Sequence, residues 1–496
     1  MGYTTLWKRL SPRQVNFLIQ TFSVVSILFE GYDQGVMGGV NASPTYVAEV
    51  GIGKLDGTVT GTTQQGGLVS IYYLGCIFGC FAGGWLADRL GRINGLLFGS
   101  LFALVGGALQ ASIQSSDFML VARVVTGIGT GALTGITPAL VNLGISVAYW
   151  LSFGLSFINH GYSDFGWRFL LAFQCIPALI LVICIKALPD SPRYLVSAGR
   201  NDEARDLLNR IRCHRTSQKE IDREYLEILP NLVCHDSFGK GGRPGANLGR
   251  RAWLCILLQI MASWTGITAV TAYSPVLLSQ AGYSETKQSG LAGGLNSIGI
   301  IGTITSAQIV DRLGRRKCLV LGSAGSLYEG SLRHPDKAIQ YAPGAVAMLF
   351  LFNLGNLGHD SLLIPTEIFP SDLRAQGNGF GITGWAIGVG MTTLINPIMF
   401  GNIKSRSYFL LAGLNLCWVP IVYLFYPETR NRSLESIEAL FSTPSPFYWE
   451  MERAYYLHGS VLVERIETMI CRPSISVLIC IVDRGHIRTC LSEQLQ

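Results

Sequence analysis

Three charged residues lie inside long apolar stretches of the chain: Glu30, Asp33 and Arg123. Asp33 is in the middle of the first apolar run, and Glu30 lies one helical turn earlier on the same face. An unpaired charge at mid-bilayer costs about 2.5–3.5 kcal/mol, so these side chains should face a cavity and one another. Burial and a nearby arginine act in opposite directions on the proton affinity of a carboxylate. The set could therefore act as a proton switch, and the alternative is a static structural ion pair.

Two further sets of charged residues are repeated along the chain. Asp-Arg-Leu-Gly-Arg occurs at 88–92 and again at 311–315, each time between two apolar runs. Pro-Asp-Ser-Pro-Arg at 189–193 and Pro-Glu-Thr-Arg at 427–430 form a second pair, and both pairs are about 220 to 240 residues apart. We expect both copies of Asp-Arg-Leu-Gly-Arg to form a four-residue turn. The charged side chains of the turn would pair with one another and with helix ends. Doubled modules of this kind are typical of transporters.

The composition points to a membrane protein. The chain has 496 residues, of which 49% are hydrophobic and only 14% charged, whereas soluble domains carry about 25% charged residues. The net charge of +6 is spread over loops, which argues against a nucleic-acid partner. The 12 cysteines are scattered without a C-x-x-C pair and are expected to be reduced. No metal-spaced His/Cys set or Walker loop is present in the sequence, so neither a metal, a cofactor nor an enzymatic activity is expected.

The apolar runs predict an all-α fold of twelve transmembrane helices in two six-helix halves. The first half is 1–188, a cytosolic linker with short helices is 189–250, the second half is 251–426, and a cytosolic tail is 427–496. Residues 202–208 of the linker read as an amphipathic surface helix. The expected spans lie near 15–40, 66–87, 94–113, 118–138, 139–159, 167–188, 251–278, 290–310, 317–332, 343–365, 377–400 and 407–426.

Lys and Arg in the N-terminus, the 88–92 loop and the linker predict that both termini are cytosolic. Two regions are shorter than this fold needs. The stretch 118–160 must hold two spans with no polar loop between them, and the span near 317–332 is too short to cross about 30 Å of hydrocarbon. A truncated loop and a truncated helix are therefore expected, and residues 466–496 show no clear periodicity.

The chain resembles the sugar porter family of the major facilitator superfamily, particularly its fungal members. The Asp of Pro-Asp-Ser-Pro-Arg stands where the family has Glu. The strings that carry the resemblance are Gly31 to Gly39, Gly84 to Arg92, Arg123 to Gly131, Pro189 to Arg193, Glu367 to Pro370 with Arg374 and Gly377, and Pro427 to Arg430 followed by Ser433 to Glu435.

The resemblance implies proton coupling through Asp33 and Arg123, since related symporters carry an Asp at this position. Glu30 departs from the family, where an apolar residue is usual. It is either a second titrating group or a polar lining of the cavity. The resemblance also implies a conformational latch, formed by Asp88, Arg89, Arg92, Asp311, Arg312, Arg315, Glu367, Arg374, Asp190, Arg193, Glu428 and Arg430.

The substrate site implied by the resemblance is altered in the seventh span. The family's glutamine pair is replaced by Ala262-Ser263 and its asparagine by Thr268, which weakens a hexose assignment. About 20 residues of the loop after Pro138 are also missing relative to the family. The remaining candidates for binding hydroxyl groups, each with plain helix packing as the alternative, are Gln259, Thr265, Thr268, Tyr273, Asn296 and Trp385.

The expected function is uptake of a small neutral sugar (hexose, pentose, disaccharide) or a related polyol across the plasma membrane. The mechanism would be alternating access with proton symport, in contact with membrane lipid and without nucleic acid. The alternatives are a nutrient sensor that does not transport and an inactive paralogue.

Overall fold

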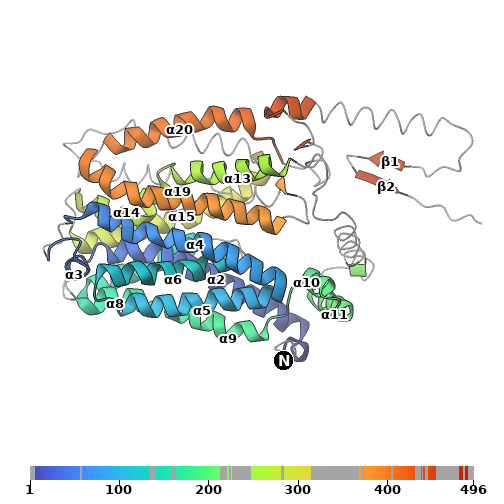
Figure 1. The fold of residues 1–496 in the computed structure, drawn as a ribbon, viewed down its shortest axis with the longest axis horizontal. Helices are drawn as coiled ribbons and strands as arrows, with labels where there is room; N and C mark the ends of the chain where they lie inside the picture. Colours follow the sequence, from blue (N-terminus) through green and yellow to red (C-terminus); the bar gives the residue numbers. More distant parts are fainter. Residues whose placement is uncertain are drawn as a thin grey trace, which may run out of the picture.

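The computed structural model of the chain is a bundle of long helices in two layers (Figure 1). It describes residues 6–55, 59–134, 141–158, 163–212, 221–222, 225, 247–280, 284–313, 368–369, 374–403, 406–429, 437, 440–441, 445–453, 480–483 and 486–489. Within these ranges, six helices or helix pairs are long and apolar enough to cross a membrane. Apolar side chains of these helices also face outward, as a lipid environment requires, including those of Phe78, Phe81, Val105 and Ile183.

Most predicted spans of the first half are helices in the structure. Helix α2 begins cleanly because Ser11 and Gln14 form a reciprocal capping box and Pro12 opens the first turn. The helices are α1 Leu6–Arg9, α2 Pro12–Val40, α4 Thr62–Leu90, α5 Arg92–Ala111, α6 Ser116–Thr134 and α7 Asn142–Ser156. The shortened 135–140 connection lies outside the described residues.

The sixth predicted span is broken into two helices. α8 Asp164–Phe173 and α9 Cys175–Cys184 meet at Gln174, and the 3-10 turn η2 Ile185–Ala187 follows. Pro177 explains the break, because it has no N–H to donate to the carbonyl of Phe173.

The predicted four-residue turn at 88–92 is wrong. Helix α4 continues to Leu90 and α5 begins at Arg92, so Gly91 alone separates them. Gly91 has φ +99°, a conformation that is strained for residues with a side chain. Asp88 and Arg89 are therefore helical residues of α4, and Asp311 and Arg312 likewise lie in a helix of the second half.

The loop predicted between the first two spans contains a short helix, α3 Pro44–Glu49. The ring of Tyr46 packs edge-on against Trp167 of α8, with 5.5 Å between centroids. Arg168 forms an ion pair with Glu49 and donates to the carbonyl of Ile113 at 3.0 Å. These contacts tie α3 to the end of the bundle that lies opposite the linker (Figure 1).

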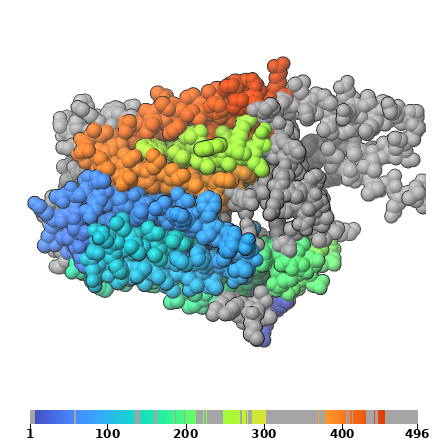
Figure 2. All heavy atoms as spheres, in the orientation of Figure 1, coloured from blue at the N-terminus to red at the C-terminus, as the bar shows by residue number. Residues whose placement is uncertain are grey.

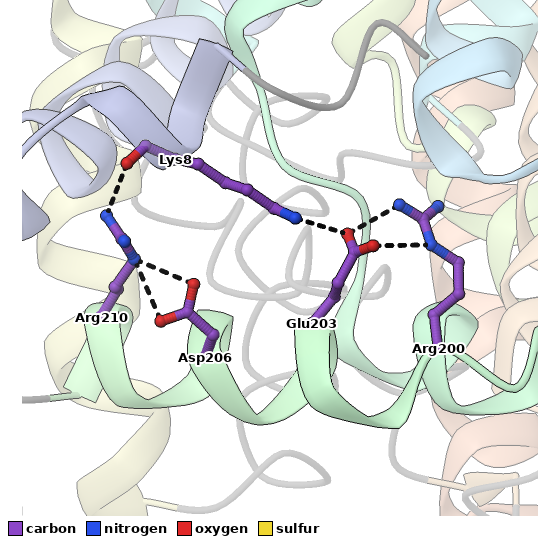
Figure 3. A network of polar contacts seen from close by, with 5 residues as sticks. All are labelled: Lys8, Arg200, Glu203, Asp206 and Arg210. Atoms are coloured by element: carbon purple, nitrogen blue, oxygen red, sulfur yellow. Dashed lines mark hydrogen bonds and ion pairs between the residues drawn. The ribbon is translucent and has the colours of Figure 1, made fainter. Parts of the chain in front are cut away.

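The described part of the predicted linker contains α10 Pro192–Ser197 and α11 Asn201–Arg212, and α11 confirms the predicted amphipathic helix. Its apolar face, with Leu207 fully buried, packs against Trp7 of α1. Figure 3 shows the polar side of this contact. Glu203 accepts hydrogen bonds from Arg200 and pairs with Lys8, while Arg210 binds the carbonyl oxygen of Lys8.

The second half contains α13 Leu248–Ser263, α14 Ile267–Gln280, α15 Glu285–Leu313, α19 Arg374–Ile403 and α20 Arg406–Phe425. The seventh predicted span is kinked between α13 and α14, where Gly266 has φ +103°. The predicted spans near 317–332 and 343–365 lie outside the described residues. In the tail, where no structure is predicted, β1 Cys480–Asp483 pairs antiparallel with β2 His486–Thr489. The boundaries of the halves, linker and tail stay predictions.

The two layers correspond to the two halves, and among the described helices they meet chiefly along α4 with α19 and α7 with α15, with a smaller contact between α2 and α14. In Figure 2 the blue atoms of α4 lie against the orange atoms of α19. Gly66 of α4 faces the backbone of Leu394, and Gly390 of α19 faces Tyr73. α7 and α15 form the other pair, in which the indole nitrogen of Trp150 donates to Ser297 at 2.8 Å.

Candidate functional site

The structure brings Asp33 of α2 and Arg123 of α6 together. A guanidinium nitrogen of Arg123 lies 3.2 Å from Oδ1 of Asp33. The Asp33 side chain is fully buried and that of Arg123 is 2% exposed. The expectation that these two charges face one another is thus met by the geometry.

The pair has two further partners on neighbouring helices. The hydroxyl of Thr130, two turns after Arg123 on α6, donates to Oδ2 of Asp33 at 3.3 Å. The ring of Tyr72 on α4 lies 4.5 Å from the guanidinium carbon of Arg123, which is cation–π geometry. The ion pair therefore sits where α2, α4 and α6 converge.

Glycines let the helices approach closely enough to bury this pair. A β-carbon at Gly127 or Gly131 of α6 would collide with the α4 carbonyls of Tyr72 or Cys76. On the other side of α2, a β-carbon at Gly31 would collide with the backbone of Val141 at the start of α7. The glycine-rich strings that carry the family resemblance are thus packing surfaces for the charged centre.

Glu30 is also buried, with 5% of its surface exposed. It lies one turn before Asp33 on α2, near the hydroxyl of Thr134 at the end of α6. That hydroxyl donates to the carbonyl of Thr130 at 2.9 Å. The three charges expected from sequence therefore form one cluster between α2 and α6.

Sequence reasoning missed the polar residues that support this cluster. Thr126, Thr130 and Thr134 recur at every fourth position and form a stripe along α6. The buried amide of Gln110 on α5 donates to the Thr126 hydroxyl at 2.6 Å. The signal was present in the spacing, since this stripe begins three residues after Arg123.

The predicted sugar-binding residues lie on α13, α14, α15 and α19, except Thr265, which lies in the kink between α13 and α14. Thr265 donates to the carbonyl of Ala262 at 2.8 Å and Thr268 to that of Ser263 at 3.3 Å. Their hydroxyl protons are thus used within the helix, although both oxygens keep acceptor capacity.

The other candidates are buried or packed as well. Gln259 is 1% exposed. Asn296 donates to its own helix at the carbonyl of Ala292, 2.9 Å away, and the Tyr273 hydroxyl donates to the carbonyl of Thr393 at 2.8 Å. Trp385 lies edge-on to Tyr73 of α4, with 5.4 Å between centroids. Trp385 is thereby placed where the two halves meet.

Of the predicted latch, the structure joins Asp190 to Arg92. Oδ1 of Asp190 accepts the backbone N–H of Arg92 at 2.9 Å and that of Ser191 at 3.0 Å. Burial raises the pKa of Asp190, and these N–H groups act against that rise.

The remaining latch residues are described only in part. Arg89 lies over the ring of Trp85, 4.8 Å from its centroid, and Glu428 accepts the N–H of Thr429 at 3.1 Å. The residues whose side chains or positions lie outside the described set are Asp88, Arg193, Asp311, Arg312, Arg315, Glu367, Arg374 and Arg430.

Comparison with known proteins identifies the family. The sequence profile described as "Sugar (and other) transporter" matches residues 18–142 and 139–441. These two segments overlap at residues 139–142, directly after Pro138. Sugar transporter STL1 of Saccharomyces cerevisiae is 30% identical, over 87% of this chain and 82% of that protein. The galactose-proton symporter of Escherichia coli K12 is 28% identical, over 86% of this chain and 95% of that protein.

Solved structures support the fold. The proton:xylose symporter XylE, bound to 6-bromo-6-deoxy-D-glucose, matches with a TM-score of 0.70 and 21% identity. The match covers 86% of this chain and 99% of that one. The predicted twelve-helix major facilitator fold is thereby confirmed. The chain is an integral, multi-pass membrane protein and belongs to the sugar porter family of the major facilitator superfamily.

Proposed function

We propose that this chain takes up a sugar or related neutral polyol across the plasma membrane by alternating access, coupled to the entry of protons. The observation that carries the coupling is the buried ion pair between Asp33 and Arg123, 3.2 Å apart. The names of two relatives, a galactose-proton symporter and a proton:xylose symporter, support the same coupling.

The pair has the properties of a two-state switch. When Asp33 is ionised, it holds Arg123 and ties α2 to α6. When Asp33 takes up a proton, the electrostatic attraction is lost and the two helices are free to separate. The Tyr72 ring, 4.5 Å from the guanidinium carbon, continues to stabilise the charge of Arg123 in that state. Proton binding thus changes how firmly α2, which also contacts α14 of the second half, is held within the first half.

The energy available to such a switch is sufficient for accumulation. One proton that crosses a potential of about 100 mV releases about 2.3 kcal/mol. A pH difference of one unit adds about 1.4 kcal/mol. Together these sustain a concentration ratio of several hundred-fold for a neutral substrate that moves with one proton.

The candidate side chains of the second half support the proposed substrate class. The candidate side chains are amides, hydroxyls and the Trp385 ring, which suit the hydroxyl groups and C–H faces of a neutral polyol. With Ala262-Ser263 in place of the family's glutamine pair, hexoses should bind less well than in other members.

The test is uptake of radiolabelled D-xylose, D-galactose and xylitol into proteoliposomes with an imposed pH gradient. Asp33→Asn should abolish accumulation but preserve counterflow, because asparagine keeps the shape and much of the hydrogen bonding and cannot carry a proton. Thr392→Val is the matched control, since Thr392 is buried and donates only within its own helix, α19. Accumulation by Asp33→Asn that equals the parent's and is equally sensitive to a protonophore would refute the coupling. Binding of these substrates without counterflow would favour a sensor. Absence of both binding and counterflow would favour an inactive paralogue.

A further inference from the structure

We propose that Glu30, with the α6 hydroxyls of Thr130 and Thr134, is the exit through which the coupled proton leaves Asp33 toward the linker side. This inference rests on the proposed proton coupling and assigns the next group in its path. α2 runs from Pro12, beside the linker helix α11, to Val40 at the opposite end, so Glu30 lies one turn nearer the linker than Asp33.

Two carboxylates and two hydroxyls are paired between α2 and α6. Asp33 and Glu30 are three residues apart on α2 and therefore lie on one face. Thr130 and Thr134 are four residues apart on α6, and each lies near one carboxyl. The Thr130 hydroxyl donates to Asp33, and Thr134 lies near Glu30. The four side chains thus lie close together where α2 and α6 meet, and the Thr134 hydroxyl is linked to Thr130 through the backbone carbonyl of Thr130.

Each hydroxyl has one hydrogen and two acceptor sites. It can therefore donate to a carboxylate or accept from a carboxylic acid, depending on which form its neighbour has. The Thr134 hydroxyl is 2.9 Å from the carbonyl of Thr130, to which it can donate. In that state it accepts from Glu30, which requires Glu30 to be a carboxylic acid. Thr130 has the same choice, since its hydroxyl reaches either Oδ2 of Asp33 at 3.3 Å or the carbonyl of Thr126 at 3.2 Å.

The net charge of the buried cluster favours one proton shared between the carboxyls of Glu30 and Asp33. With both ionised, Glu30, Asp33 and Arg123 carry a net charge of −1 in a buried site, and one proton makes the cluster neutral. In the proposed step, the O–H bond of the Asp33 carboxylic acid breaks and Asp33 becomes a carboxylate held by Arg123. The Glu30 carboxylate gains that proton, and a later loss of it to water on the linker side resets the pair.

Among the residues that the structure describes, the titratable groups near Glu30 are Asp33 on its own helix and the Cys76 thiol on α4, with Arg123 beyond Asp33. α7 meets this part of α2 through Gly144 and the backbone of Val141, which cannot exchange a proton.

The experiment compares Glu30→Gln, Glu30→Asp, Thr134→Val and Asp33→Asn in the full chain, with Thr392→Val as the matched control for removal of a buried threonine hydroxyl. The first readout needs no sugar: infrared difference spectra of the reconstituted protein during pH exchange. Titrating carboxylic-acid bands of both groups should be present in the parent. The Glu30 contribution should be lost in Glu30→Gln and retained in Glu30→Asp, and the Asp33 contribution should be lost in Asp33→Asn. The second readout is proton-driven uptake of D-xylose and D-galactose, measured beside counterflow.

Glu30→Gln should slow proton-driven uptake by about tenfold or more and leave counterflow within about twofold, as expected for loss of a proton-transfer group. Glu30→Asp should recover most of the rate, and Thr134→Val should lie between parent and Glu30→Gln. Loss of activity that Glu30→Asp does not rescue, or an unchanged infrared titration in Glu30→Gln, would overturn the proposal. If Asp33→Asn fails to accumulate while Glu30→Gln behaves as the parent, the exit alone is refuted. If Asp33→Asn accumulates normally, the coupling itself is refuted.

Discussion

The carboxylate of Asp190 caps the start of α5, because its Oδ1 accepts the backbone N–H of Arg92 at 2.9 Å. The first N–H groups of a helix have no partner within the helix, and the helix dipole favours a negative group there. Gly91 makes this approach possible, since a β-carbon at that position would collide with the Asp190 carboxylate. The two motifs of the first half, 88–92 and 189–193, are thereby joined into one structural unit.

Asp190→Ala should lower the free energy of unfolding by about 1 kcal/mol, the usual value of a helix cap. Asp190→Asn should cost less, because the amide oxygen can still accept from Arg92. Gly91→Ala should lower the free energy of unfolding more than either variant, because it combines an unfavourable φ with a collision between the new β-carbon and the Asp190 carboxylate. Thermal unfolding of the purified protein in detergent would measure all three. A melting temperature of Asp190→Ala equal to the parent's would show that the cap is energetically silent.

The contact between α1 and α11 should weaken in acid because of Glu203. Burial would raise the pKa of Glu203, but the hydrogen bond and charge of Arg200, with Lys8, lower it overall. A lowered folded-state pKa means that the stabilisation is present above the unfolded pKa of about 4.3 and is lost as pH falls through the folded value.

The matching experiment measures the unfolding temperature of the parent and Glu203→Gln at pH 7 and pH 3.5. The difference between them should be small at pH 7, since partly exposed pairs contribute about 0.2–1 kcal/mol, and should shrink further at pH 3.5. A difference that grows in acid would contradict the sign of this linkage.

Arg123→Leu should destabilise the protein by about 3–5 kcal/mol, because it leaves the fully buried Asp33 carboxylate without its charge partner. Adding Asp33→Leu should recover most of this loss, since two apolar groups need no compensation in a buried site. Unfolding temperatures of both single variants and the double variant give the coupling energy. Simple additivity of the two single losses would mean that the ion pair contributes nothing beyond packing.

Glutamine should fit at one position of the seventh-span pair, Ala262, and should destabilise the protein at the other, Ser263. Ser263 is buried against α19, where a β-carbon on Gly388 would collide with its side chain. Ser263→Gln should therefore overpack this contact and lower the free energy of unfolding by about 1–3 kcal/mol. Ala262 is partly exposed, so Ala262→Gln should fit and raise D-galactose uptake. Measurements of D-galactose uptake and of the unfolding temperature of each variant test this prediction. Equal stability of both variants would show that α13 and α19 separate readily at Gly388.

The sequence alone determined the family, the helical fold and the charged centre. Apolar runs of membrane length can only be helices or barrels, because every backbone polar group must be satisfied within the protein. The cost of burying Asp33 and Arg123 likewise required that each find a partner. Neither conclusion depends on how distant helices pack, so both could be reached from residue types and spacing.

Tertiary structure decided which partners these groups have. The cap that Asp190 forms on Arg92 and the bond from Thr130 to Asp33 both depend on close approach of segments far apart in sequence. The same is true of Ser263, which is buried against Gly388 of α19. Residue types show that a polar group must be satisfied, but only the packing of the helices determines which neighbour lies within hydrogen-bonding distance.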